Sequence, residues 1–184
     1  MRNTRTRLSV AAVTAFTATV LALSGTTAAH ADASAAPADG SVALAGSEDA
    51  ISGSGAWQDD WNNEGVIATN SYANSNVAAM WQQILWADGF LNWGDIDCHF
   101  GSKTRDATVK WQRHWNVDDD GKVGRETFTK AATFLRGVQG GFRYVGVDGK
   151  YISFSRSSNG KWNMSISGDW KTVWYEKSTF DKCT

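Results

Sequence analysis

The feature that most constrains the fold is a short pattern that occurs twice. Residues 97–104 read Asp-Cys-His-Phe-Gly-Ser-Lys-Thr, and residues 120–127 read Asp-Gly-Lys-Val-Gly-Arg-Glu-Thr. In both copies an Asp is followed, at the same spacing, by an apolar residue, a Gly and a Thr. Such an Asp can accept hydrogen bonds from the backbone amides after it, and the Gly permits backbone geometry that other residues avoid. Each copy therefore predicts a tight loop that leads into a helix.

Apolar residues at helical spacing extend this pattern to three helices. The first begins at Ser75 or Asn76 and ends at Gly89, the second covers about 102–115, and the third covers about 125–135 and is stopped by Gly137. The side chains expected to face inward are Val77, Met80, Trp81, Ile84, Leu85, Thr104, Ala107, Thr108, Trp111, Trp115, Phe128, Ala131, Ala132 and Leu135.

After the third helix the apolar residues alternate instead. Short strands are predicted at 142–147, 151–157, 162–167 and 171–175. Two of the intervening turns contain Asp-Gly and Asn-Gly, dipeptides that favour tight hairpins. The predicted fold class is therefore α+β: a three-helix module, assigned to residues 57–137, followed by a small antiparallel β-meander at 138–184 that packs on it.

Nineteen positions of the helical part form one ordered motif. They are Val77, Met80, Ile84, Leu85, Gly89, Asp97, Phe100, Gly101, Thr104, Ala107, Trp111, Gln112, Val117, Asp120, Gly121, Val123, Gly124, Thr127 and Phe128. This motif resembles the peptidoglycan-binding-like domain family, a three-helix module attached to cell-wall hydrolases, over about residues 72–136. The chain departs from the family at Trp81, which we place where a Gln is usual, and at Cys98, which replaces the Gly of the first Asp-Gly pair. The resemblance implies peptidoglycan as the ligand.

The N-terminal residues predict export. Arginines precede an uncharged apolar run at residues 8–23, and residues 29–31 have the small-x-small pattern that signal peptidase cleaves. A transmembrane anchor is the alternative, although the run is short for a span and contains Ser and Thr. We expect a signal peptide at 1–31, a disordered linker at 32–56 and a secreted, extracellular or wall-associated protein without a membrane span after cleavage.

Net charge bears on the binding partner, and the cysteine content bears on the covalent structure. Without the predicted signal peptide the net charge is about −4, whereas nucleic-acid binding needs clustered Lys and Arg. We therefore expect no nucleic-acid partner. Cys98 and Cys183 are the two cysteines, and such a pair in an exported chain normally forms a disulfide. Free thiols and zinc ligation are the alternatives, and a zinc site would lack its usual ligands.

No catalytic residue, metal site or cofactor is predicted. Wall amidases hold zinc with three protein ligands, and neither His99 nor His114 begins a pattern of that kind. Residues 116–121 approximate a calcium loop, but Thr127 occupies the position that needs a bidentate acid. A solvated turn before the third helix is the preferred interpretation. We expect the protein not to be an enzyme.

Ten Trp residues supply candidates for ligand binding. Sugars lay their C–H faces on aromatic rings while nearby polar groups bind the hydroxyls. Trp81 and Trp111 fall at core positions. Trp86 lies off the apolar stripe of its helix and Trp93 lies in the loop that follows. These two residues and His99 are the candidate peptidoglycan-binding residues.

The sequence thus predicts a secreted, non-catalytic protein that binds cell-wall peptidoglycan. The alternative is a secreted protein–protein interaction module, such as an inhibitor or toxin-like factor, that uses the same scaffold. In that case the β-meander is the expected surface for a protein partner. Retention by insoluble peptidoglycan distinguishes the two functions.

Overall fold

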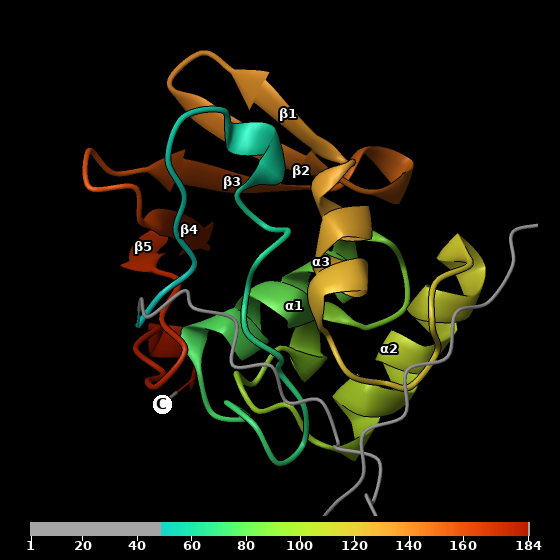
Figure 1. Ribbon diagram of the computed structural model, residues 1–184. Coiled ribbons are helices and arrows are strands. Elements are labelled where there is room, and N and C mark those ends of the chain that lie inside the picture. The colour runs from blue at the N-terminus through green and yellow to red at the C-terminus, as the bar shows by residue number, and fades with distance from the viewer. Residues whose placement is uncertain (1–48, 184) are drawn as a thin grey trace, which may run out of the picture. The chain divides into compact units, whose positions relative to one another are not determined.

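The computed structural model describes residues 49–183, so the expected signal peptide and most of the expected linker lie outside the described residues. Three helices precede five strands, and the strands lie together on one side of the helices (Figure 1). The predicted α+β class is confirmed. The elements are α1 (Asn76–Ala87), α2 (Ser102–Trp115), α3 (Arg125–Ala132), β1 (Leu135–Val138), β2 (Gly141–Val145), β3 (Tyr151–Arg156), β4 (Trp162–Ile166) and β5 (Asp169–Thr172).

The described residues also form four short 3-10 helices: η1 (Trp57–Asp59), η2 (Trp93–Asp95), η3 (Val147–Gly149) and η4 (Asp181–Cys183). Within residues 49–183, none of the helices has the length and apolarity that crossing a membrane requires.

The first two helices begin and end close to the residues predicted from the sequence. Ser75 caps α1, because its Oγ accepts a hydrogen bond from the Ala78 amide at 3.0 Å. After α1 the chain turns at Gly89, whose φ of 82° is in the left-handed region. Helix α2 has the predicted bounds, and Asn116 ends it in a left-handed conformation.

The predicted end of the third helix is wrong. Helix α3 ends at Ala132, and Leu135 begins strand β1, so Gly137 lies within a strand and does not stop the helix. Leu135 is buried opposite Tyr144 of β2. Its spacing from Phe128 suits an inward helical position, but pairing with β2 buries it equally well and also satisfies the backbone of β1.

The sheet is an antiparallel meander with the order β1-β2-β3-β4-β5. Strands β2 to β5 correspond to the four predicted strands, and β1 is additional. At the turn between β2 and β3, Asp148 and Gly149 have φ values of 55° and 73°. At the turn between β3 and β4, Gly160 has a φ of 87°. Both predicted turn dipeptides therefore supply left-handed backbone.

Aromatic rings fill the core on both sides of α1, which contacts both α2 and β3. Between the helices, the rings of Trp81 and Trp111 lie 5.1 Å apart and are fully buried, as predicted. Beneath the sheet, Trp61 packs 5.5 Å from Phe154 and 5.6 Å from Trp162. The helices and the sheet thus share one continuous core.

One buried carboxylate joins the helices to the sheet. Asp88 follows α1, and its Oδ2 accepts hydrogen bonds from Trp111 Nε1 of α2 and the Tyr144 hydroxyl of β2, each at 2.6 Å. Burial raises the pKa of the Asp88 carboxyl, while the two donors act in the opposite direction. The predicted packing of the β-meander on the helical module therefore includes a polar link.

The predicted linker extends too far toward the C-terminus. Ala50 and Ile51 are buried, and Ile51 makes backbone hydrogen bonds with Val173 at 3.0 Å and Trp162 at 2.9 Å. The segment thus pairs with the sheet. One buried large apolar residue and several backbone hydrogen bonds dock this Ala-, Ser- and Gly-rich stretch, and average composition conceals both.

The predicted disulfide between Cys98 and Cys183 is confirmed, with a Cα–Cα distance of 5.5 Å. It links the first repeated loop to η4. Cys98 has a φ of 62°, so it adopts the left-handed backbone that the Gly of the family motif would adopt without strain.

Candidate functional site

A buried glutamine holds each copy of the repeated loop. In the first copy the Oε1 of Gln82 accepts from the Cys98 amide at 2.8 Å. Its Nε2 donates to three oxygens: Asp97 Oδ1 at 2.7 Å, His99 O at 3.0 Å and Thr104 Oγ1 at 3.0 Å. The repeated Asp and Thr are therefore partners of one side chain from the preceding helix.

Gln112 does the same for the second copy. Its Oε1 accepts from the Gly121 amide at 2.9 Å. Its Nε2 donates to Lys122 O at 2.7 Å, Thr127 Oγ1 at 3.0 Å and Asp120 Oδ1 at 3.3 Å. The two glutamines occupy equivalent positions in the two halves of the module.

This equivalence corrects the alignment of the first helix. Trp81 does not replace the family Gln, because the next residue, Gln82, makes the contacts that Gln112 makes in the second copy. Trp81 is a core residue whose Nε1 donates to Thr108 Oγ1 at 2.7 Å. The chain therefore departs less from the family motif than its sequence suggests.

A groove of about 380 Å³ lies between α1, η2 and the sheet. The helical side contributes Gln83, Trp86 and Trp93. The sheet side contributes the residues around two turns: Gly149, Lys150, Tyr151, Ile152, Ser153, Ser165, Ser167 and Gly168. We call this hollow the Trp86–Trp93 groove.

The groove brings two of the three predicted binding residues together. The ring centroids of Trp86 and Trp93 lie 4.8 Å apart with an interplanar angle of 66°, an edge-to-face arrangement. Trp86 is partly buried against the core, and Trp93 is 36 % exposed. Trp86 therefore supports the more exposed indole.

Polar groups lie beside this aromatic pair. Gln83 donates from Nε2 to Met164 Sδ at 3.2 Å and to Ser165 O at 3.4 Å, which fixes α1 against β4. Within residues 49–183, the hydroxyls of Ser153 and Ser167 have no side-chain hydrogen bond, so both are available to a ligand. An aromatic surface bordered by hydroxyl groups suits the apolar face and the polar substituents of a sugar.

His99 does not belong to the groove. Its Nδ1 lies 2.6 Å from Asn74 Oδ1, and its backbone pairs with Asn74 in an isolated bridge. The ring therefore holds the segment before α1 against the first repeated loop. The prediction that grouped His99 with Trp86 and Trp93 is not matched by their positions.

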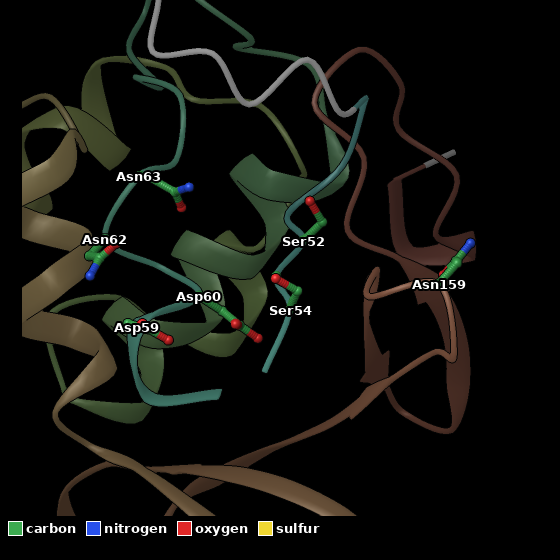
Figure 2. A pocket seen from close by; sticks show the side chains of 8 residues that line it. Ser52, Ser54, Asp59, Asp60, Asn62, Asn63 and Asn159 are labelled. Atoms are coloured by element: carbon green, nitrogen blue, oxygen red, sulfur yellow. The ribbon is translucent and has the colours of Figure 1, made fainter. Parts of the chain in front are cut away.

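A second hollow, of about 390 Å³, has a different character (Figure 2). It is lined by Ser52, Gly53, Ser54, Asp59, Asp60, Asn62, Asn63 and Asn159, without an aromatic side chain. The Oδ2 of Asp60 is already bound by Arg156 at 2.7 Å and by Trp162 Nε1 at 2.8 Å. This polar hollow offers no stacking surface, so the Trp86–Trp93 groove is the better candidate site.

In the calcium-like turn at residues 116–121, two of the acidic side chains bind other residues of the protein. Asp119 forms an ion pair with Arg113, and the Oδ1 of Asp120 accepts from the Lys122 amide at 2.8 Å as well as from Gln112. Among the described residues, no cluster of three or more His, Cys, Asp or Glu side chains is arranged to hold a metal.

The helical module matches a known protein family. Residues 74–130 match a family model described as "Putative peptidoglycan binding domain", in agreement with the resemblance seen in the sequence. The match includes both repeated loops and Trp86 and Trp93, and it ends before β1. The sheet side of the groove thus lies outside it. No curated protein and no solved structure matches the chain.

Proposed function

We propose that this protein is a secreted, non-catalytic peptidoglycan-binding protein and that the Trp86–Trp93 groove is its binding site. One observation carries the proposal: a paired indole surface, with ring centroids 4.8 Å apart, belongs to the part of the chain that matches a peptidoglycan-binding family. Stacking on an indole and hydrogen bonding to serine hydroxyls are interactions that a glycan chain with N-acetyl groups can satisfy.

The non-catalytic part of the proposal rests on how the perturbed carboxyls are used. Burial raises the pKa of Glu64 to about 7 and also raises the pKa of Asp88, as a general acid would require. Glu64 accepts from the Tyr175 hydroxyl at 2.8 Å and the Ser52 amide at 3.2 Å, and Asp88 accepts from two buried side chains. Neither carboxyl lines the groove.

Secretion is supported by the residues before the described part. The apolar run at 8–23 and the small-x-small pattern at 29–31 are those of a signal peptide. The disulfide between Cys98 and Cys183 also suits an oxidising compartment.

Sedimentation with purified insoluble peptidoglycan tests the binding site. Trp93→Ala and Trp86→Ala should each reduce the bound fraction while circular dichroism shows a folded protein. Trp174→Ala is the matched control, because Trp174 also lies beside lysines but outside the groove. Trp111→Ala should instead unfold the protein, since it opens a cavity in the core at a cost of about 3 to 5 kcal/mol. Wild-type binding by both groove variants would refute the assignment.

The same preparation tests the absence of catalysis. Peptidoglycan incubated with the wild-type protein and divalent metals should release neither muropeptides nor reducing ends. Release that is lost in a variant of a single acidic residue would show an enzyme instead.

The alternative function also has support in the structure. Trp170 of β5 is 50 % exposed and Val145 of β2 is 43 % exposed, so the sheet presents apolar side chains to solvent. A protein partner on the β-meander would bind there. In that case the wild-type protein should remain in the supernatant with peptidoglycan.

A further inference from the structure

Two lysines flank the aromatic pair of the groove. Lys150, after the turn that precedes β3, places its Nζ 5.7 Å from the ring centroid of Trp86 and donates to the Trp86 carbonyl at 3.3 Å. Lys182 of η4 places its Nζ 5.4 Å from the ring centroid of Trp93. Each ammonium group is attracted to the face of its indole. A positive charge therefore lies beside each of the two indoles: Lys150 lines the groove itself, and Lys182 is placed next to it by its contact with Trp93.

Two acidic side chains of this region are paired with other lysines. Asp95 of η2 is bound by Lys103 at 2.6 Å, and Asp169 of β5 is bound by Lys171 at 2.8 Å. Within residues 49–183, neither Lys150 nor Lys182 forms an ion pair.

Asp88 is a further acid close to Lys150. It interacts with the charge of Lys150 at longer range, but its Oδ2 is occupied by Trp111 and Tyr144. An ammonium group has three donors, so both lysines retain donors for an external acceptor.

The disulfide fixes the backbone that carries one of these lysines. Lys182 precedes Cys183, which is bonded to Cys98 in the first repeated loop. Trp93 lies in η2, directly before the same loop. Phe180 is fully buried and its carbonyl accepts from the Cys183 amide at 2.9 Å, which anchors the same turn from the other side. The contact between Lys182 and Trp93 is therefore held by a covalent link and by the core.

We infer that the Trp86–Trp93 groove recognises a carboxylate of peptidoglycan, with Lys150 and Lys182 as its ligands and the two indoles packed against the adjoining sugar or peptide. This inference rests on the proposed function. The glycan backbone is neutral where its lactyl groups are amide-linked to peptides, so the free carboxylates belong to the stem peptides or to lactyl groups that have lost them. Ammonium-to-carboxylate hydrogen bonds are among the stronger polar contacts in proteins.

The test compares four soluble ligands by isothermal titration. They are a disaccharide-peptide with free carboxylates, the same compound after amidation of its carboxylates, a disaccharide with a free lactyl carboxylate but no peptide, and a neutral chitooligosaccharide. Amidation should weaken binding by about tenfold. Lys150→Gln and Lys182→Gln should each weaken binding of the carboxylate ligand by several-fold and should weaken binding of the amidated ligand clearly less.

Lys177→Gln is the matched control, because the Nζ of Lys177 lies 4.0 Å from the centroid of Trp174, outside the groove. Its binding should equal that of the wild-type protein. Tight binding of the lactyl disaccharide would assign the carboxylate to the lactyl group, and tight binding of the disaccharide-peptide alone would assign it to the stem peptide.

Equal affinity for the free and amidated ligands, with no effect of either lysine variant, would overturn the inference and leave the proposed function intact. Failure of the wild-type protein to bind any of these ligands and insoluble peptidoglycan would overturn both.

Discussion

The two copies of the repeated loop have the same hydrogen-bonded scaffold and different attachments. In each, one glutamine from the preceding helix binds an Asp, a Thr, a carbonyl and an amide of the loop. The second copy has Gly121 at the left-handed position and leads only into α3. The first has Cys98 at that position, forms a disulfide and follows the 3-10 helix that carries Trp93.

The contacts that the two copies share stabilise the fold, and the features found only in the first copy lie near the candidate binding site. The shared contacts specify a loop and a helix start, and they are satisfied equally in both halves. Only the first copy adjoins an indole of the groove, Trp93, and only the first copy has a disulfide, whose second cysteine follows Lys182, the lysine beside that indole. Left-handed backbone at a residue other than Gly costs about 1 kcal/mol or more, and the disulfide can offset that cost.

The largest expected effect is loss of the covalent link in the first copy. The disulfide closes a loop with a sequence separation of 85 residues. On the chain-entropy model it stabilises the fold by about 4 to 5 kcal/mol, so Cys98→Ser combined with Cys183→Ser should lower the free energy of unfolding by that amount. Urea denaturation of the oxidised wild-type protein and the double variant measures it. A difference below about 1 kcal/mol would show that the first copy, like the second, does not need a disulfide for its stability.

Removal of either glutamine should have the next largest effect. Gln82→Ala and Gln112→Ala each leave several buried donors and acceptors without partners, at an expected cost of about 3 kcal/mol. If the scaffolds are equivalent, the two variants should lose similar stability in thermal or urea unfolding. Binding should differ: at a temperature where both are folded, only Gln82→Ala should weaken retention by peptidoglycan. Equal binding by both variants would remove the functional distinction between the copies.

Substitution of the residue with left-handed backbone should change the free energy of unfolding by a smaller amount. Loss of Gly at this position should destabilise the second copy, and gain of Gly should stabilise the first. Gly121→Ala should cost about 1 to 2 kcal/mol, because φ is 73° and the new Cβ would lie 2.8 Å from Arg105 Cγ. In a chain that already carries Cys183→Ser, Cys98→Gly should be about 1 kcal/mol more stable than Cys98→Ser. Chemical denaturation of these variants compares the two positions directly. A less stable Cys98→Gly variant would mean that the first loop needs its side chain for packing.

The smallest expected effect is that of salt on binding. If the attachments of the first copy bind the wall at close range, the overall charge contributes little, because the chain is net acidic and the wall is anionic. Retention of the wild-type protein should change by less than about threefold between about 0.05 M and 0.5 M salt, since close contacts are screened less than distant ones. Loss of binding at moderate salt would show that attraction between charges, and not stacking on the indoles, dominates binding.

The sequence predicts the elements whose residues are close together in the chain. Helix α2 has its predicted bounds because its apolar side chains recur within a few residues of one another. Leu135 shows the limit, since its position suits both a longer helix and a paired strand, and only the distant Tyr144 decides between them. The role of Gln82 is not evident from the sequence, because its bulky neighbour Trp81 dominates the apolar pattern of the helix.

The same limit applies to the site. The sequence singles out Trp86 and Trp93 because one lies off the apolar stripe of its helix and the other lies in the adjacent loop. The structure places both in one groove, and their role in binding stays a prediction. Lys150 and Lys182 were not, because each meets its indole only after the sheet has packed on the module. The contact between His99 and Asn74 is likewise not evident from the sequence, and because His99 lies outside the groove its role in binding stays a prediction.

The burial of Glu64 links the stability of the fold to protons. Burial disfavours the carboxylate and raises the pKa of Glu64 to about 7 in the folded protein. In the unfolded chain, where the side chain is solvated, the pKa is near its usual value of 4.5. The folded state thus binds an extra proton between these values, so this contribution is fully present below about pH 4.5 and is lost as pH rises through 7. It amounts to about 3 kcal/mol at most. Because Glu64 also accepts from the Ser52 amide, the N-terminal segment and the sheet should loosen together in mildly alkaline solution, and Glu64→Gln should flatten the pH profile of the melting temperature.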